Sequence, residues 1–236
     1  KATSMRVVLA PDSFKGSLSA PDVCAALGRG IARALPDAQI LARPMADGGE
    51  GTLDAVLAAV GPAGCRRALS VQGAGGGAVE AAYGEIGDGT AATAVIEVAQ
   101  VVGITDAGAM AVPVADRSTR GVGELIAALL DRGVRRFMIG LGGSSTNDGG
   151  AGLLGALGLA LQDGAGRPVE PTPRGLAAVA RVDASGLDSR LAAAEITIMS
   201  DVNNPLCGRR GATAIFGPQK GVRPHEVAAI DATLAR

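Results

Sequence analysis

Histidine, cysteine and aromatic residues are scarce in this 236-residue chain. The only histidine is His225, so a site built from several histidines is excluded and a Ser–His–Asp triad would have to use that residue. The three cysteines, Cys24, Cys65 and Cys207, are widely spaced and form no CxxC pair. They predict no disulfide framework, which is typical of a reducing compartment, and we expect a cytoplasmic protein.

An excess of charge and long apolar runs are also lacking. The net charge is −1 at pH 7 and aromatic residues make up 2% of the chain, whereas nucleic-acid binding favours a basic surface and stacking rings. The longest nearly uncharged apolar run, residues 149–161, is too short to cross a bilayer. We therefore expect no nucleic-acid partner and no membrane insertion. The 47% of hydrophobic residues predict a globular core.

Strands and helices alternate in the first third of the chain. Residues 1–4 precede Met5, which we expect to be the native start, and they are left out of the fold prediction. Strands are predicted at 6–10 and 39–42. A helix is predicted after Ser19, an N-cap with Asp22 at capping-box spacing, and another over 53–60. This order is typical of a parallel sheet covered by helices.

The glycine-rich stretch 73–77 predicts a domain boundary. Segments 79–83 and 93–98 then predict an antiparallel hairpin. Further on, the pattern predicts helices from 121, over 153–161 and over 225–236, and strands at 136–141 and 196–199. We predict an α/β fold with two domains, residues 1–75 and 76–236.

Aspartates follow three of the predicted strands directly: Asp12, Asp47 and Asp201. Ligands of open α/β sheets bind beyond the carboxyl ends of strands, where carboxylates can hold Mg²⁺ or accept a proton from a hydroxyl. Each aspartate could instead cap a helix or stabilise a turn. Their equivalent positions favour a site.

Two glycine loops join a strand to a helix. Residues 140–150 read GLGGSSTNDGG and offer backbone N–H groups and hydroxyl or amide donors to a phosphate or a carboxylate. The loop is neither a Walker A motif nor a clean dinucleotide fingerprint, and a tight turn is the plain alternative. Residues 47–52 read DGGEGT, where two carboxylates favour a metal or a hydroxyl-bearing substrate over a mobile surface loop.

Lysine is rare, because only three of the 22 basic residues are lysines. Lys15 and Lys220 lie in glycine-flanked loops, where a compact positive charge can follow a moving phosphoryl group. Two ordinary solvated lysines are the alternative.

Taken together, these segments resemble the bacterial type I glycerate kinases. The matching stretches, in the family's order, are 10–17 (APDSFKGS), 46–52 (ADGGEGT), 140–150, 200–206 (SDVNNPL) and 216–221 (FGPQKG). The resemblance implies phosphorylation of D-glycerate by ATP with Mg²⁺, at the 2-hydroxyl. It also implies a Rossmann-like three-layer domain and a mixed-sheet α/β domain with the active site in the cleft between them. Members of the family continue beyond this chain's last residue, so we expect further residues to complete the first domain.

Our hypothesis for the site follows the chemistry of phosphoryl transfer, which asks mainly for positioning and charge neutralisation. Asp47 would accept the hydroxyl proton, Lys15 and Lys220 would offset negative charge, and Asp148 or Asp201 would hold Mg²⁺. The predicted substrate- and phosphate-binding residues are Ser17, Gly48, Gly49, Glu50, Gly142, Gly143, Ser144, Thr146, Asn147, Asn203 and Asn204.

Two other functions stay open from the sequence. A Rossmann-type dehydrogenase would also alternate strands with glycine loops, although residues 13–18 lack its glycines. A non-catalytic fragment of a kinase is the second. The sequence leaves the position of the phosphorylated hydroxyl, the identity of the base and the oligomeric state open.

Overall fold

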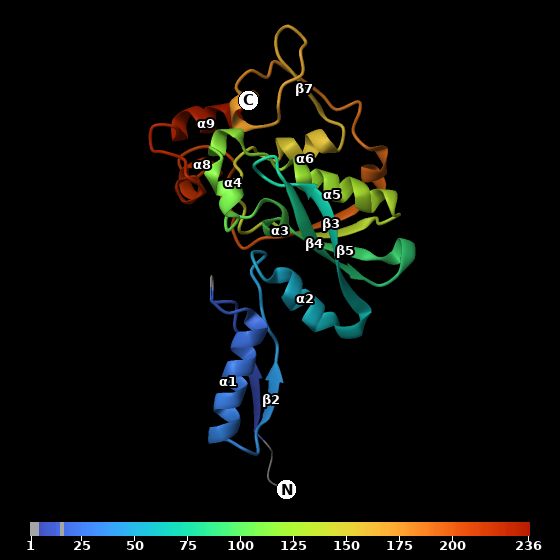
Figure 1. The fold of residues 1–236 in the computed structure, drawn as a ribbon, viewed down its shortest axis with the longest axis vertical. Coiled ribbons are helices and arrows are strands. Elements are labelled where there is room, and N and C mark those ends of the chain that lie inside the picture. The colour runs from blue at the N-terminus through green and yellow to red at the C-terminus, as the bar shows by residue number, and fades with distance from the viewer. Residues whose placement is uncertain (1–4, 15–16) are drawn as a thin grey trace.

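The computed structural model describes residues 5–14 and 17–236. The chain forms a mixed α/β structure with one large sheet and two small ones (Figure 1). The strands are β1 (Arg6–Leu9), β2 (Gln39–Ala42), β3 (Gly64–Gln72), β4 (Ala78–Ile86), β5 (Thr93–Glu97), β6 (Arg136–Gly140), β7 (Ala160–Gln162), β8 (Arg181–Asp183) and β9 (Glu195–Met199). The α-helices are α1 (Ala20–Ala34), α2 (Thr52–Val60), α3 (Ala99–Val102), α4 (Ala107–Ala111), α5 (Arg120–Asp131), α6 (Ala151–Ala156), α7 (Pro173–Leu176), α8 (Ala212–Phe216) and α9 (Val227–Leu234).

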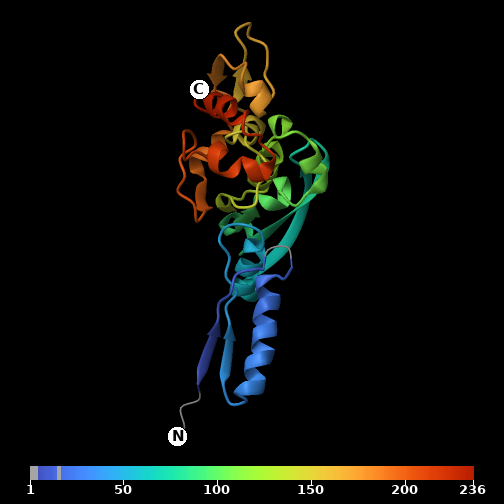
Figure 2. The ribbon, with the colours of Figure 1, turned by 90° about the vertical axis from the view of Figure 1, so that its left-hand side faces the viewer.

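The N-terminal unit is β1, α1 and β2, and it extends away from the rest of the molecule (Figures 1 and 2). β1 and β2 are parallel, as predicted. α1 begins where the sequence predicts, because the Ser19 hydroxyl accepts a hydrogen bond from Asp22 N at 3.2 Å. Only the first turn of the expected apolar face is buried, at Val23, whereas Leu27 and Leu35 are exposed. The covering layer of a three-layer unit is therefore not formed by the described residues.

The large sheet has the strand order β3-β4-β5-β6-β9. β3, β4 and β5 are antiparallel neighbours, and β5, β6 and β9 are parallel, so the sheet is mixed as predicted. The predicted hairpin is confirmed, since Tyr83 lies opposite Ile96 in the β4–β5 pair. β3 was missed by the sequence reasoning, because its side chains are mostly exposed and show no clear alternation of burial.

The glycine-rich stretch 73–77 is the connection between β3 and β4, which pair along their whole length. The predicted boundary at residue 75 therefore falls inside one hairpin rather than between two units. A second correction concerns residues 153–161: α6 ends at Ala156, and Leu161 lies in β7, which pairs with β8. Gly158 with a φ of +104° interrupts the helical pattern there.

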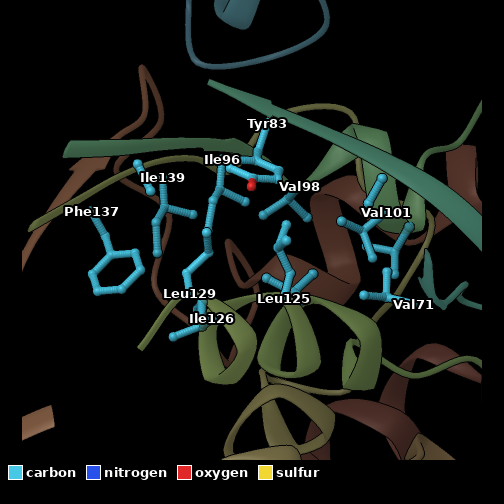
Figure 3. Packing of buried hydrophobic residues seen from close by; sticks show 14 of the residues in the cluster. Val71, Tyr83, Ile96, Val98, Val101, Leu125, Ile126, Leu129, Phe137 and Ile139 are labelled. Carbon is cyan, nitrogen blue, oxygen red and sulfur yellow. The ribbon is translucent and has the colours of Figure 1, made fainter. Parts of the chain in front are cut away.

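The main core lies between the large sheet and α5 (Figure 3). Alternate residues of β5 face opposite sides, as a pleated strand requires. Ile96 points to the α5 side, where it joins Leu125 and Leu129. Val95 and Glu97 face the other side, which α2 covers. The sheet is thus fixed between two helices, and the segment that leads into α2 is held against it.

Candidate active site

The segments that follow β2, β6 and β9 meet beyond the carboxyl ends of the parallel strands of the large sheet. β6 and β9 are parallel neighbours, so their carboxyl ends lie at the same edge. Leu141 N donates to Met199 O at 3.2 Å, and Gly142 N donates to Gly48 O at 2.9 Å. The 47–52 loop, which is distant in sequence, is thereby bound to the end of β6.

Glycine is required where these backbones touch. A Cβ on Gly48, whose φ is +89°, would lie 2.4 Å from Met199 O. A Cβ on Gly142 would lie 2.5 Å from Gly49 Cα. Any side chain at either position would push the loops apart. The glycines predicted to bind a phosphate are therefore also needed for packing, and Gly142 N, predicted to face an anion, donates to Gly48 instead.

An open groove of about 460 Å³ runs between this loop and the end of β9. Asp47 and Asp201 both line it, together with Thr52 at the start of α2 and several apolar side chains of α2. Asp47 is half-buried, and its Oδ1 accepts a hydrogen bond from Gly49 N at 2.9 Å. Asp201 is exposed. Two aspartates that follow separate strands thus line one groove.

Lys220 brings an ammonium group to the neighbouring loop. Its Nζ donates to Ser144 Oγ at 2.9 Å and to Thr146 O at 2.7 Å. Loss of solvent lowers the pKa of Lys220 to about 8; the nearby Asp148 carboxylate opposes this shift and the Arg117 guanidinium adds to it. The two oxygens that hold this ammonium are neutral and do not cancel its charge, and burial has removed much of its solvent. An ammonium in such surroundings is well suited to bind an incoming anion.

The 144–147 loop is supported by buried polar contacts. Ser145 Oγ donates to Val102 O at 2.9 Å, and Ile104 N donates to Gly143 O at 2.8 Å. Asn147, predicted to bind phosphate, is buried and its Nδ2 donates to Thr213 Oγ1 in α8 at 3.0 Å. Asn147 therefore fixes the loop rather than facing a ligand in this structure.

Asp148, predicted as a metal ligand, is buried and fully engaged with backbone and hydroxyl donors. Its Oδ2 accepts from Thr119 N and Thr119 Oγ1 at 2.8 Å each and from Gly152 N at 3.1 Å, and its Oδ1 accepts from Gly150 N at 3.2 Å. These contacts cap α6 and tie it to α5. Asp148 is thus a structural carboxylate, and Asp201 is the exposed one.

The remaining predicted residues lie in turns and loops and are not among the residues that line the groove. Glu50 is exposed in the 47–52 loop, and Asn203 is exposed after Asp201. Asn204 Nδ2 donates to Arg210 O at 2.9 Å, which stabilises its own loop. Ser17 is exposed and its hydroxyl donates to Phe14 O at 3.0 Å. The prediction for Lys15 lies outside the described residues.

The sequence reasoning missed two buried charged residues, Glu97 and Arg117. Glu97 at the end of β5 accepts from Gly51 N and Leu53 N at 3.1 Å each, which fixes the 47–52 loop and the start of α2. Burial raises the pKa of Glu97, and the two backbone donors oppose the shift. A carboxylate in the otherwise apolar run 93–98 was the available signal. Nothing in the sequence indicates that Arg117 is buried, because its neighbours in sequence are ordinary polar residues.

The residues described here contain no cluster of three or more histidine, cysteine or carboxylate side chains that could enclose a metal ion. Mg²⁺ is commonly bound by one or two carboxylates together with substrate phosphates, so a dedicated cluster is not needed. Exposed Asp201 fits that donor set. Over the same residues, no helix is both long and apolar enough to span a bilayer.

Comparisons with known proteins point to one family. The model of the glycerate kinase family matches residues 7–236. The chain is 46% identical over 222 residues to glycerate kinase of Bacillus subtilis (strain 168), covering 92% of this chain and 56% of that protein. It is 43% identical over 236 residues to glycerate 2-kinase of Escherichia coli K12, covering 98% of this chain and 60% of that protein.

A solved structure is also similar. The crystal structure of a candidate glycerate kinase 2 from Salmonella typhimurium LT2 superposes with a TM-score of 0.83 at 44% identity, over 99% of this chain and 62% of that one. The chain thus spans about three fifths of the length of the relatives it matches.

Proposed function

Since the chain belongs to the glycerate kinase family, we propose that the protein carrying it transfers the terminal phosphoryl group of ATP to the 2-hydroxyl of D-glycerate. The position of the phosphate follows the relative named glycerate 2-kinase, which is 43% identical. The ligands of this proposal are small molecules, ATP and D-glycerate, with Mg²⁺.

The observation that carries the proposal is the backbone contact between the loop that binds the Lys220 ammonium and the loop that carries the Asp47 carboxylate. Lys220 reaches Ser144 and Thr146, and the same loop contacts Gly48 next to Asp47. Phosphoryl transfer needs a hydroxyl held next to an acceptor for its proton, and positive charge next to the transferred group. Both kinds of group are present here.

Each residue has a defined task in this proposal. The Asp47 carboxylate accepts the proton that leaves the glycerate hydroxyl as the new P–O bond forms. Protonated Lys220 offsets the negative charge of the phosphoryl oxygens, and the Ser144 hydroxyl holds the ammonium in place. Glu97 and Asp148 act behind these groups by fixing α2 and α6.

Asp201 is the carboxylate best placed to hold Mg²⁺, because it is exposed at the groove that Asp47 also lines. When bound with ATP, the ion would neutralise phosphate charge. Asp148 is no longer assigned this task, because its oxygens already accept hydrogen bonds from Thr119, Gly150 and Gly152.

The test is D-glycerate-dependent release of ADP by the complete protein that carries this chain. We predict that Asp47→Asn lowers kcat by about 10² to 10⁴, the usual effect of losing a general base. Glu80→Gln, on the exposed side of β4, is the matched control and should leave kcat unchanged. Near-normal turnover of Asp47→Asn would reject its role, and no glycerate-dependent ADP release would reject the function.

The product identifies the hydroxyl. In a proton-coupled ³¹P spectrum, a phosphate on the 2-hydroxyl couples to one carbon-bound proton and gives a doublet. A phosphate on the 3-hydroxyl couples to two such protons and gives a triplet or a doublet of doublets. A doublet is expected.

A further inference from the structure

Arg117 is a buried cation behind the proposed site, with 2% of its surface exposed. It follows the short 3₁₀ turn Val114–Asp116 in extended backbone. Its Nε donates to Val112 O at 2.8 Å, and its Nη2 donates to Met110 O at 3.2 Å. These contacts fix the guanidinium to the last turn of α4 and to the residue that follows it.

The same guanidinium joins two parts of the site. Nη1 donates to Ser145 O at 2.9 Å and to Lys220 O at 2.9 Å. One acceptor is in the loop that holds the Lys220 ammonium, and the other is the backbone of Lys220 itself. Lys220 is thus held at its carbonyl by Arg117 and at its Nζ by Ser144 and Thr146.

The acceptors of Arg117 are neutral. They are the carbonyl oxygens of Met110, Val112, Ser145 and Lys220 and the sulfur of Met110. Arginine stays protonated even where burial lowers its pKa, as it does here. Because these partners leave its charge uncancelled, Arg117 adds positive potential at Lys220, where the nearby Asp148 carboxylate acts in the opposite sense and more strongly.

We infer that Arg117 is a positioning residue for Lys220: it clamps the Lys220 turn onto the Ser145 loop and adds a positive charge next to the place where a polyanion would bind. Arginine suits the task because its planar fork directs several donors to separate acceptors, which the single ammonium of a lysine cannot reproduce. The inference rests on the proposed function for the role of Lys220 and adds a residue that does not touch the substrate.

The test is a double-mutant cycle in which calorimetry measures the binding of tripolyphosphate. This probe needs no turnover. The variants are Arg117→Lys, Lys220→Met and the two combined. Arg117→Lys keeps the charge and loses the fork, and we expect it to weaken binding about 10-fold, as for loss of a charge-assisted contact. In the Lys220→Met background it should change binding less than 2-fold, because Arg117 acts through Lys220.

Equal effects of Arg117→Lys in both backgrounds would overturn the inference, since a purely structural role is additive. So would wild-type binding by Arg117→Lys. Arg120→Met, which removes an exposed arginine paired with Glu124, is the control and should bind as wild type. Circular dichroism and melting temperature verify that each variant is folded.

A second readout follows the Lys220 ammonium itself. The chain has three lysines, so a sample labelled with ¹³C-lysine gives few side-chain signals, and the one lost in Lys220→Met is Lys220. We expect it to titrate near pH 8 in the wild type and at a higher pH in Arg117→Met, because the guanidinium contributes to the lowering. An unchanged titration in a folded Arg117→Met variant would contradict the inference. If the cycle is non-additive but the wild type shows no glycerate-dependent ADP release, the clamp stands and the proposed function fails.

Discussion

Asp148 and Asp201 are aspartates in opposite surroundings. Asp148 is buried and accepts hydrogen bonds from Thr119, Gly150 and Gly152, whereas Asp201 is exposed at the groove. A buried carboxylate whose acceptors are all used is costly to replace, because its donors lose their partners. An exposed carboxylate at the groove is replaceable for folding, and the proposed function gives it a role in ligand binding instead.

We predict that Asp148→Asn lowers the free energy of unfolding by about 1–3 kcal/mol, because an amide offers only one acceptor oxygen to these donors. Asp201→Asn should change it by less than about 0.5 kcal/mol and instead weaken binding of Mg²⁺ with ATP. Urea unfolding of both variants, with nucleotide titrations in Mg²⁺, checks the pair. Equal stability losses would contradict the division of roles.

Lys220 predicts a specific pH dependence. Its pKa is lowered to about 8, so the protonated form, which we propose offsets phosphate charge, is lost as the pH rises through that value. We predict that kcat/KM for ATP falls above about pH 8 in the wild type. In Lys220→Arg the overall rate is lower, but the fall disappears because the guanidinium stays charged. A fall at the same pH in both proteins would assign it to another group.

At the scale of elements, the loop that follows β2 of the β1–β2 sheet contacts the ends of two strands of the large sheet through backbone atoms. The ends of β6 and β9 and the 47–52 loop approach so closely that a Cβ on Gly142 would lie 2.5 Å from Gly49 Cα. The glycine pattern predicts such loops, because glycine permits close approach. It does not reveal that the partner of one glycine loop is the other.

We predict that Gly142→Ala lowers kcat at least about 10-fold and the free energy of unfolding by more than about 1 kcal/mol, because the loops must separate. The control is Gly164→Ala, where a Cβ would meet nothing within 4 Å. Turnover and urea unfolding are measured for both. A Gly142→Ala variant as active as Gly164→Ala would show that the contact is dispensable.

At the scale of the molecule, the chain has one well-packed body and one thin unit. Tyr83 and Ile96 in the large sheet are fully buried, whereas Val8 in β1 is 59% exposed. α1 covers one side of a two-stranded sheet, and Leu27 and Leu35 of its predicted apolar face stay exposed. That further residues complete this unit stays a prediction, as does a division into two domains, whose predicted boundary at residue 75 falls inside the β3–β4 hairpin.

We predict that amide hydrogens of β1 and β2 in this chain exchange on the order of 100-fold faster than those of β5 and β6, because local opening exposes little apolar surface there. Hydrogen exchange followed by mass spectrometry measures both segments in one experiment. Equal protection would show that the N-terminal unit is as stable as the large sheet.

The sequence by itself determined the α/β class, the β4–β5 hairpin, the start of α1 and the aspartates that follow strands, because these depend on local periodicity, capping and chain order. It also identified the glycine loops and Lys220. The tertiary structure decided that Asp148 and Asn147 support the loops, that Asp47 and Asp201 share a groove, and that Glu97 and Arg117 hold the parts together. These roles depend on burial and on partners distant in sequence, such as Arg117 and Lys220, which local patterns do not encode.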